Sequence, residues 1–214
     1  MSPDEFVDLL GRERASAILR TDDRDAAAAA MAAAVAGGFR VVEFTLTIPG
    51  AYGLIEEFAA RPGLVVGAGT VLEVEQARRA VAAGARFLVS PVVDEAVIAA
   101  AAELGVAAMP GAHTPTEMLR AHRAGAQLVK LFPAPAGGPV WLRSVLAPLP
   151  FLKVVPTNGV DAGNLAAWLA AGAWAAGFTT PLFDPGDVAA RRWQGIEERA
   201  RTILERARPA PVAV

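Results

Sequence analysis

One repeated unit constrains the fold of this chain more than any other feature of its sequence. A helical segment ends in Ala-Gly or Leu-Gly, and a short aliphatic run follows within one to three residues. Glycine just after a helix closes it in the left-handed conformation, and a continuous aliphatic run predicts a parallel strand covered on both faces. We predict eight strands, at 15–20, 39–46, 64–70, 86–90, 106–110, 127–132, 153–157 and 173–179.

Helical segments separate these strands, and the alternation predicts the fold class. Thr114-Pro115-Thr116-Glu117 has the pattern of a capping box with proline at the first helical position. Eight β-then-α units without a linker predict an α/β protein with a single (β/α)8 barrel over 1–214, in which 208–214 is a frayed tail. A doubly wound open sheet is the alternative. We expect helices at about 24–36, 51–60, 73–83, 93–103, 115–124, 139–147, 161–171 and 187–206.

Composition excludes several classes of function. The formal net charge of −2 gives no electrostatic reason to expect nucleic acid or an anionic membrane as a partner. The absence of cysteine excludes disulfides and fits a cytoplasmic protein. We expect no secretory signal, because the N-terminus lacks a basic region followed by an apolar core. Glycines and a proline interrupt the uncharged stretch 165–183, which indicates a buried helix and strand rather than a membrane span.

Lys130 is the first candidate catalytic residue. It lies in the apolar run 128–133 on a predicted buried strand, in a chain whose other cations are almost all arginine. Burying an ammonium group is costly unless the group is paired or gives up its proton. Desolvation lowers the pKa of a buried amine, and a neutral amine is a nucleophile for carbonyl carbons. A snorkelling or salt-bridged lysine is the alternative interpretation.

Glu43 is the second candidate. The active site of a (β/α)8 barrel lies at the C-terminal ends of its strands, where Glu43 and Lys130 are the two ionisable residues that stand out. If strand alternation points both side chains inward, a carboxylate and an amine share one cavity of low dielectric constant. Such a pair is typical of a catalytic site. A purely structural counter-ion for Lys130 is the alternative interpretation of Glu43.

Six short runs, in order, resemble a known family. Together they make the chain from about Ala15 to Phe183 similar to the 2-keto-3-deoxy-6-phosphogluconate (KDPG) and 4-hydroxy-2-oxoglutarate (KHG) aldolases, which are class I pyruvate-lyases. The resemblance implies a TIM barrel, a homotrimer, no cofactor and a small keto acid as substrate. The runs are Glu43-Phe-Thr-Leu, Gly67-Ala-Gly-Thr-Val, Ser90-Pro91, Pro110-Gly111 with Thr114-Pro-Thr-Glu117, Lys130-Leu-Phe-Pro133 and Pro156-Thr157.

The resemblance also implies a reaction. Lys130 is expected to form a Schiff base with a 2-keto-3-deoxy sugar acid, and Glu43 to remove the C4 hydroxyl proton, through a water. We expect KDPG to be cleaved reversibly to pyruvate and glyceraldehyde 3-phosphate, with 4-hydroxy-2-oxoglutarate, cleaved to pyruvate and glyoxylate, as a further substrate. An unphosphorylated or other keto acid is the alternative. We expect the substrate to contact Arg20, Thr70, Pro91, Phe132, Thr157, Asn158, Gly159, Thr179 and Thr180.

The chain departs from the family pattern at three places. Thr47 stands where many members carry an arginine associated with the substrate carboxylate or phosphate. Arg20 is our candidate substitute, with a solvated charge at the start of a helix as the alternative. Asn158 replaces a glycine of a Pro-Thr-Gly-Gly run, and Thr179-Thr180 replaces a Gly-Ser pair. Because glycine permits close approach of a phosphate to the backbone, these changes weaken the expectation of a phosphorylated substrate.

Three other functions fit parts of the sequence. A phosphosugar isomerase or epimerase needs no Schiff base, and a catalytically silent barrel would bind a keto acid or act as an oligomeric scaffold. A metal-dependent aldolase would need a ligand cluster, which the two histidines, His113 and His122, do not supply, so we expect no metal. We interpret His113 as an ordinary surface residue. The Gly67-Ala-Gly-Thr run lacks the third glycine of a dinucleotide fingerprint.

Overall fold

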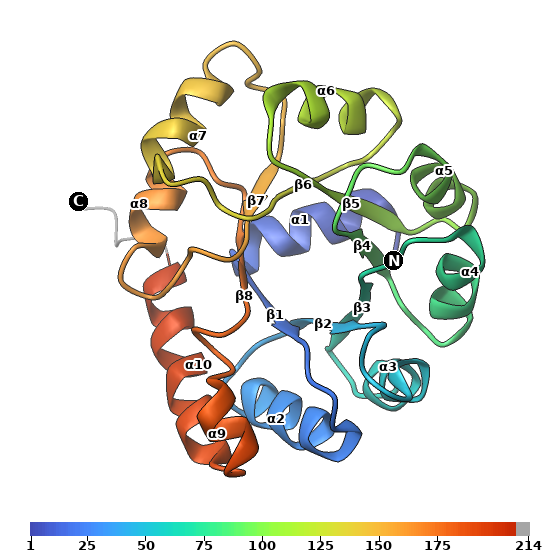
Figure 1. Cartoon of the computed structure of the whole chain (residues 1–214), viewed down its shortest axis with the longest axis vertical. Coiled ribbons are helices and arrows are strands. Elements are labelled where there is room, and N and C mark those ends of the chain that lie inside the picture. The colour runs from blue at the N-terminus through green and yellow to red at the C-terminus, as the bar shows by residue number, and fades with distance from the viewer. Residues whose placement is uncertain (209–214) are drawn as a thin grey trace.

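The computed structural model describes residues 1–208, which form a (β/α)8 barrel (Figure 1). The strands are parallel and neighbour one another in the order β7-β6-β5-β4-β3-β2-β1-β8, and a bridge between Thr157 and Gly177 joins the two ends. This sequential ring confirms the predicted barrel and shows that the doubly wound alternative is wrong. The strands are β1 (Ala15–Leu19), β2 (Val41–Thr45), β3 (Val65–Gly69), β4 (Phe87–Ser90), β5 (Ala107–Ala112), β6 (Val129–Leu131), β7 (Val154–Pro156) and β8 (Ala176–Phe178).

Helices surround the ring of strands in Figure 1, close to the ranges that the sequence predicts. Thr114 and Glu117 form the predicted capping box. Within the described residues, no helix has both the length and the apolar character needed to cross a bilayer. The expected frayed tail lies outside the described residues, apart from Arg208. The helices that surround the ring of strands are α2 (Arg24–Ala36), α3 (Ala51–Ala59), α4 (Val74–Ala82), α5 (Glu95–Glu103), α6 (Pro115–Arg123), α7 (Gly138–Leu146), α8 (Leu165–Ala170), α9 (Pro185–Ala189) and α10 (Trp193–Ala207).

The prediction of one helix over 187–206 is wrong. The chain forms α9 and α10 there, and Arg191 between them adopts a left-handed backbone conformation with φ of 56°. An L-residue in that conformation cannot continue a right-handed helix, so the direction of the chain changes at this point. The joint between α9 and α10 therefore places Arg191 at the C-terminal end of the barrel rather than on a helix surface.

A further helix, α1 (Pro3–Glu13), is absent from our prediction and covers the N-terminal end of the barrel. In Figure 1 it lies across the centre of the ring. Ser2 and Glu5 form a capping box that starts the helix. The buried ring of Phe6 stacks on that of Phe87, with 4.4 Å between the ring centroids, and the indole N–H of Trp174 donates to the carbonyl of Val7 at 2.9 Å. The helix thus closes the floor of the barrel.

Strand alternation divides the core into two clusters. The outward cluster packs the strands against the helices and includes Val42 and Phe44, whereas the inward cluster joins the apolar face of α1 to inward residues such as Val41 and Leu128. Most inward positions near the starts of the strands are therefore apolar, with buried Ser16 of β1 as an exception. Further along the same inward faces lie Glu43 and Lys130, which are buried polar residues above this apolar floor.

Candidate active site

A cavity of about 590 Å³ opens at the C-terminal ends of the strands. Ligand-binding cavities usually have volumes of roughly 300–1,000 Å³. Lys130 lines it, and so do all the expected substrate-binding residues except Gly159. The structure therefore brings together residues that are scattered over most of the sequence, as the barrel topology requires. The expected substrate-binding residues that line the cavity are Arg20, Thr70, Pro91, Phe132, Thr157, Asn158, Thr179 and Thr180.

Lys130 and Glu43 form a buried pair beneath this cavity. The Nζ atom of Lys130 lies 3.9 Å from Oε1 of Glu43, and the two residues are 9% and 1% exposed. Neither carboxyl oxygen has a hydrogen-bond partner among the residues that the structure describes. Both side chains point into the barrel, as strand alternation indicates, and the lysine does not snorkel to solvent. An unsatisfied buried carboxyl beside an amine is a feature of sites rather than of cores.

The electrostatic environment of Glu43 suits proton transfer. Burial raises the pKa of the carboxyl above its ordinary value of 4.5, while the charges of Lys130 and Arg20 act in the opposite direction. Desolvation disfavours the charged form of a carboxyl, and a carboxyl with a raised pKa is a stronger base than an ordinary carboxylate. Glu43 therefore combines a raised pKa with a position 3.9 Å from the amine, as the expected acid–base role requires.

Gly69 explains why this carboxyl fits. A Cβ atom at Gly69 would lie 1.9 Å from Oε1 of Glu43, so any side chain there would occupy the space of the carboxyl group. A Cβ atom at Gly67 would lie 2.3 Å from the ring of Phe87. The glycines of the Gly67-Ala-Gly-Thr70 run thus serve the packing of the barrel interior, as the absence of a complete dinucleotide fingerprint indicates.

Arg20 and Thr70 form a polar group in the lining of the cavity. The Nη2 atom of Arg20 donates to the hydroxyl of Thr70 at 3.1 Å, and the charge of Arg20 acts on Glu43. The arginine therefore faces the cavity rather than serving only as a solvated charge at the start of α2. Guanidinium and hydroxyl groups side by side are suited to bind a carboxylate. Thr47 is exposed, contacts only the hydroxyl of Thr45 at 2.8 Å, and does not line the cavity.

Thr157 presents a buried hydroxyl to the cavity. The residue is 1% exposed, and its Oγ1 atom has no hydrogen-bond partner among the described residues. A buried hydroxyl without a partner costs about 1–3 kcal/mol. Such a group is therefore expected to bond to a ligand or a water. The loops that follow supply Asn158, in a left-handed conformation with φ of 60°, and Thr179 and Thr180.

The cavity also contains charged residues that our sequence analysis missed. Asp22, Asp23 and Arg191 line its outer part. Asp23 has the pattern of an N-cap before an alanine-rich helix, which is a local signal, but no local pattern indicates that Arg191 lies opposite it. His113 is exposed and bonds through Nδ1 to the carbonyl of Pro133 at 2.9 Å, outside the cavity lining. Within 1–208, no group of histidine and acidic residues could hold a metal ion.

Comparisons with known proteins agree on one family. The family model described as "KDPG and KHG aldolase" matches residues 8–199. A probable 2-dehydro-3-deoxy-6-phosphogalactonate aldolase of Rhizobium meliloti is 39% identical over 173 residues, covering 79% of this chain and 82% of the relative. A 2-dehydro-3-deoxy-phosphogluconate aldolase of Pseudomonas aeruginosa is 35% identical over 210 residues, covering 94% of this chain and 92% of the relative.

Solved structures give the same result. A structure described as native KDPGal has a TM-score of 0.82 and 32% identity, covering 90% of this chain and 93% of that one. KDPG aldolase from Legionella pneumophila, with pyruvate captured as a covalent carbinolamine intermediate, has a TM-score of 0.83 and 26% identity, covering 92% of this chain and 97% of that one. The family-model match over residues 8–199 includes Lys130 and the other residues that line the cavity.

Proposed function

This chain belongs to the KDPG and KHG aldolase family and is therefore a carbon–carbon lyase, and on that premise we propose that it cleaves a 2-keto-3-deoxy-6-phosphohexonate to pyruvate and glyceraldehyde 3-phosphate. The observation that carries the proposal is the buried pair of Lys130 and Glu43, 3.9 Å apart, beneath a cavity that opens to solvent. The bond-breaking step of a class I aldolase uses an amine nucleophile and an acid–base group, which this pair supplies.

The first step forms the covalent intermediate. The neutral amine of Lys130 attacks C2 of the keto acid, a new C–N bond forms, and the carbonyl oxygen takes up a proton to give a carbinolamine. Loss of this oxygen as water leaves a protonated Schiff base. Glu43 is the acidic group in contact with the amine, and its raised pKa allows it to deliver and recover these protons.

The second step breaks the C3–C4 bond. Glu43, directly or through a water, removes the proton of the C4 hydroxyl, so C4 becomes the aldehyde carbon of glyceraldehyde 3-phosphate. The bonding electrons move into the Schiff base, which becomes an enamine. Protonation at C3 and hydrolysis of the C–N bond then release pyruvate and restore the amine. The apolar floor beneath the pair keeps the local dielectric constant low, which strengthens each charge interaction.

The cavity residues divide between the two ends of the substrate. Arg20 and Thr70 hold the C1 carboxylate next to Lys130. Phe132 and Pro91 flank the reacting carbons, and the free hydroxyl of Thr157 hydrogen-bonds to the bound intermediate. Asn158, Thr179 and Thr180 contact the distal part of the sugar chain. Each role is open to test by substitution.

The relatives named above act on gluconate-type and galactonate-type substrates, which differ in configuration at C4. A cleavage assay that compares both phosphorylated epimers, their unphosphorylated forms and 4-hydroxy-2-oxoglutarate identifies the substrate. We expect pyruvate from at least one phosphorylated epimer at the highest kcat/KM. Faster cleavage of an unphosphorylated acid would contradict the proposed substrate and leave the aldolase chemistry intact.

Trapping of the Schiff base tests the chemistry itself. Borohydride reduction in the presence of pyruvate should add one reduced adduct to Lys130, detectable by mass spectrometry of the peptide. Lys130→Ala should give no adduct and no cleavage. Lys153 is the only other lysine and does not line the cavity, so Lys153→Ala is the matched control. This variant should keep both adduct formation and cleavage. Turnover by Lys130→Ala would favour an isomerase or epimerase. Binding of keto acids without turnover by the wild-type protein would indicate a catalytically silent barrel.

Assembly and location complete the proposal. The family resemblance supports a homotrimer, and sedimentation analysis should then give a mass three times the 22.1 kDa of one chain. The proposed substrate is a small metabolite, and the proposed compartment is the cytoplasm, which a chain without cysteine fits.

A further inference from the structure

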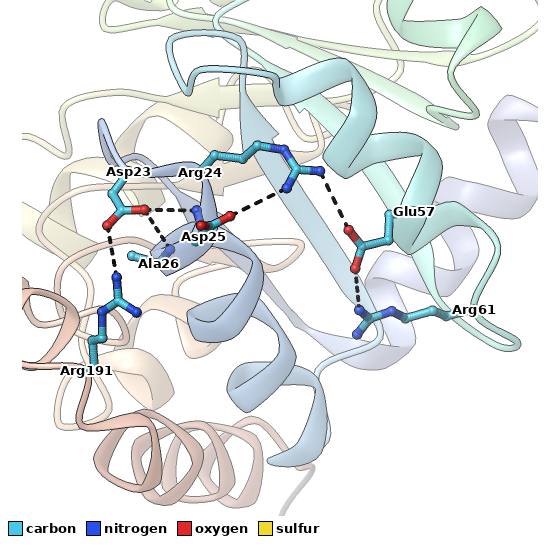
Figure 2. Close-up of polar contacts among 7 residues, drawn as sticks. All are labelled: Asp23, Arg24, Asp25, Ala26, Glu57, Arg61 and Arg191. Atoms are coloured by element: carbon cyan, nitrogen blue, oxygen red, sulfur yellow. Dashed lines mark hydrogen bonds and ion pairs between the residues drawn. The ribbon is translucent and has the colours of Figure 1, made fainter.

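An ion pair spans the outer rim of the cavity. The Nη2 atom of Arg191, in the joint between α9 and α10, lies 3.7 Å from Oδ2 of Asp23, which precedes α2. Figure 2 shows the two side chains pointing toward each other from different elements. Both residues line the cavity that contains Lys130. A cation is thus held at the mouth of the site by a single acidic partner.

Asp23 is fixed in place whether or not it contacts Arg191. Its Oδ1 atom accepts hydrogen bonds from the backbone N–H groups of Asp25 and Ala26, both at 2.9 Å, and so caps α2 (Figure 2). The hydrogen bond from Ala26 is the main cause that lowers the pKa of Asp23 below its ordinary value, so the carboxylate is charged. The other oxygen is left to face Arg191.

The backbone of Arg191 is also fixed, although its side chain is not. The neighbouring Arg192 and the more distant Arg199 both pair with Asp187 of α9, at 2.6 and 2.7 Å, which fastens α9 to α10. In contrast, the guanidinium of Arg191 is 64% exposed and is paired with Asp23 at a distance longer than a hydrogen bond. Exposed pairs of this kind contribute little, so the guanidinium can exchange its partner at low cost.

The proposed substrate needs a second cation at the outer end of this cavity. It carries a carboxylate at one end and a phosphate at the other, and Arg20, which bonds to Thr70 and acts on Glu43 through its charge, can serve only one of them. Among the cavity-lining residues that the structure describes, the cations are Arg20, Lys130 and Arg191. Without Arg191, the rim would present Asp22 and Asp23 alone, whose charges repel a phosphate.

We infer that Arg191 selects phosphorylated substrates by leaving Asp23 and pairing with the phosphate group at the cavity rim. The inference rests on the proposed function for its substrate, but the site itself is defined by the geometry of the rim. Arginine is suited to the role because its planar guanidinium binds phosphate oxygens in a bidentate manner. Asp23 then acts as a competing partner that holds the guanidinium in position while the cavity is empty and lowers the affinity for phosphate.

Steady-state kinetics of Arg191→Ala test the inference. A charge-assisted hydrogen bond contributes about 1.5–3 kcal/mol, so KM for the phosphorylated substrate should rise roughly tenfold or more while kcat changes little. KM for the unphosphorylated acid should not change, and Arg191→Lys should recover part of the loss. Arg78 is the matched control, because it is 58% exposed and pairs with Glu75 at 4.0 Å outside the cavity. An equal change in KM for both substrates would overturn the inference.

The Asp23→Asn variant should change KM in the opposite direction to Arg191→Ala. Asparagine caps a helix about as well as aspartate, so α2 should be retained while Arg191 loses its competing partner. We expect KM for the phosphorylated substrate to fall several-fold, and the fall to be smaller in the Arg191→Ala background. An unchanged or higher KM in a variant with wild-type thermal stability would overturn the role assigned to Asp23.

A binding measurement separates this inference from the proposed function. Calorimetric titration with 3-phosphoglycerate, with glycerate as the unphosphorylated reference, reports on the rim without any turnover. We expect the preference for 3-phosphoglycerate to be lost in Arg191→Ala and kept in Arg78→Ala. If borohydride trapping at Lys130 fails while this pattern holds, the proposed reaction is wrong and the phosphate site stands. Equal preference in wild type and Arg191→Ala overturns the site, whatever the outcome of trapping.

Discussion

The position of the Glu43 carboxyl depends on a residue that has no side chain. A Cβ atom at Gly69 would lie 1.9 Å from Oε1 of Glu43, so Gly69→Ala must displace the carboxyl from its present position beside Lys130. We expect kcat to fall by roughly 10²–10⁴, the usual contribution of general acid–base catalysis, while pyruvate adduct formation at Lys130 persists at a reduced rate. Single-turnover assays of cleavage and borohydride trapping measure the two effects separately.

Gly53→Ala is the control for this substitution. Gly53 lies within α3, where a Cβ atom would meet nothing closer than the Nη2 atom of Arg24 at 3.9 Å. Alanine is favoured over glycine in a helix by about 0.5–1 kcal/mol, so this variant should be slightly stabilised with unchanged kcat. Wild-type kcat in Gly69→Ala would show that the carboxyl tolerates displacement and would contradict its assigned role.

Candidate site residues were predictable where the pattern of a single strand determines their position. Lys130 and Glu43 stand out because a charged residue in an aliphatic strand has few structural reasons to be there. Arg191 and Asp23 were not predictable, because their contact joins the two ends of the chain and depends on ring closure between β8 and β1. Local patterns identify the cap at Asp23, but they contain no information about its partner across the rim.

At the scale of single elements, α1 should contribute much of its stabilisation through one aromatic side chain. Phe6 is fully buried and stacks on Phe87 inside the barrel. Because truncation of a buried phenylalanine typically costs about 3–5 kcal/mol, Phe6→Ala should lower the free energy of unfolding by that amount in urea denaturation. Val140→Ala, at a residue that is 71% exposed, should change it by less than about 0.5 kcal/mol. A small effect of Phe6→Ala would show that α1 is dispensable for the core.

The two helices at the chain ends show where prediction from sequence fails. The start of α1 carries a clear capping signal, Ser2-Pro-Asp-Glu5, but a helix before the first strand has no place in the β-then-α repeat that organised our prediction. The break at Arg191 has a different cause. No local pattern in the stretch 187–206 interrupts a helix, and the contacts of Asp187 with Arg192 and Arg199 that fasten the joint form only in the folded chain.

At the scale of the whole molecule, Glu43 should impose an unusual pH dependence on stability. Since burial raises its pKa, the folded protein retains a proton that the unfolded chain releases above about pH 4.5. The native state then binds more protons than the unfolded state, so the contribution of Glu43 is complete below that pH and is lost as the pH rises through the folded-state pKa. The hydrogen-bonded carboxylates Glu117 and Asp187 have lowered pKa values and contribute in the opposite direction.

Glu43→Gln removes this pH-dependent contribution. We expect the variant to gain stability relative to the wild type as the pH is raised from about 4 toward neutral, because glutamine keeps the shape of the protonated acid without its ionisation. Urea denaturation at several pH values measures the difference. Parallel stability curves for the two proteins would contradict the raised pKa.

The β-then-α alternation was easier to predict from the sequence than the closure of the sheet into a ring. The regular return of glycine between helix and strand specifies the β-then-α alternation, because each glycine marks a helix end that no other residue tolerates as well. Strand order is a long-range property, and the same alternation is compatible with an open sheet. The resemblance to a family of barrels distinguishes the closed ring from the open sheet.

The floor formed by α1 leaves the reacting lysine accessible from one side only. Everything that enters the site must pass the rim, and everything that leaves must return the same way. In the proposed reaction, the keto-acid half stays covalently attached at the bottom until its bond to nitrogen is hydrolysed, whereas the aldehyde half lies above it. Departure of the products is therefore ordered, with the aldehyde first and pyruvate last, and in the reverse direction pyruvate must load before any aldehyde can react.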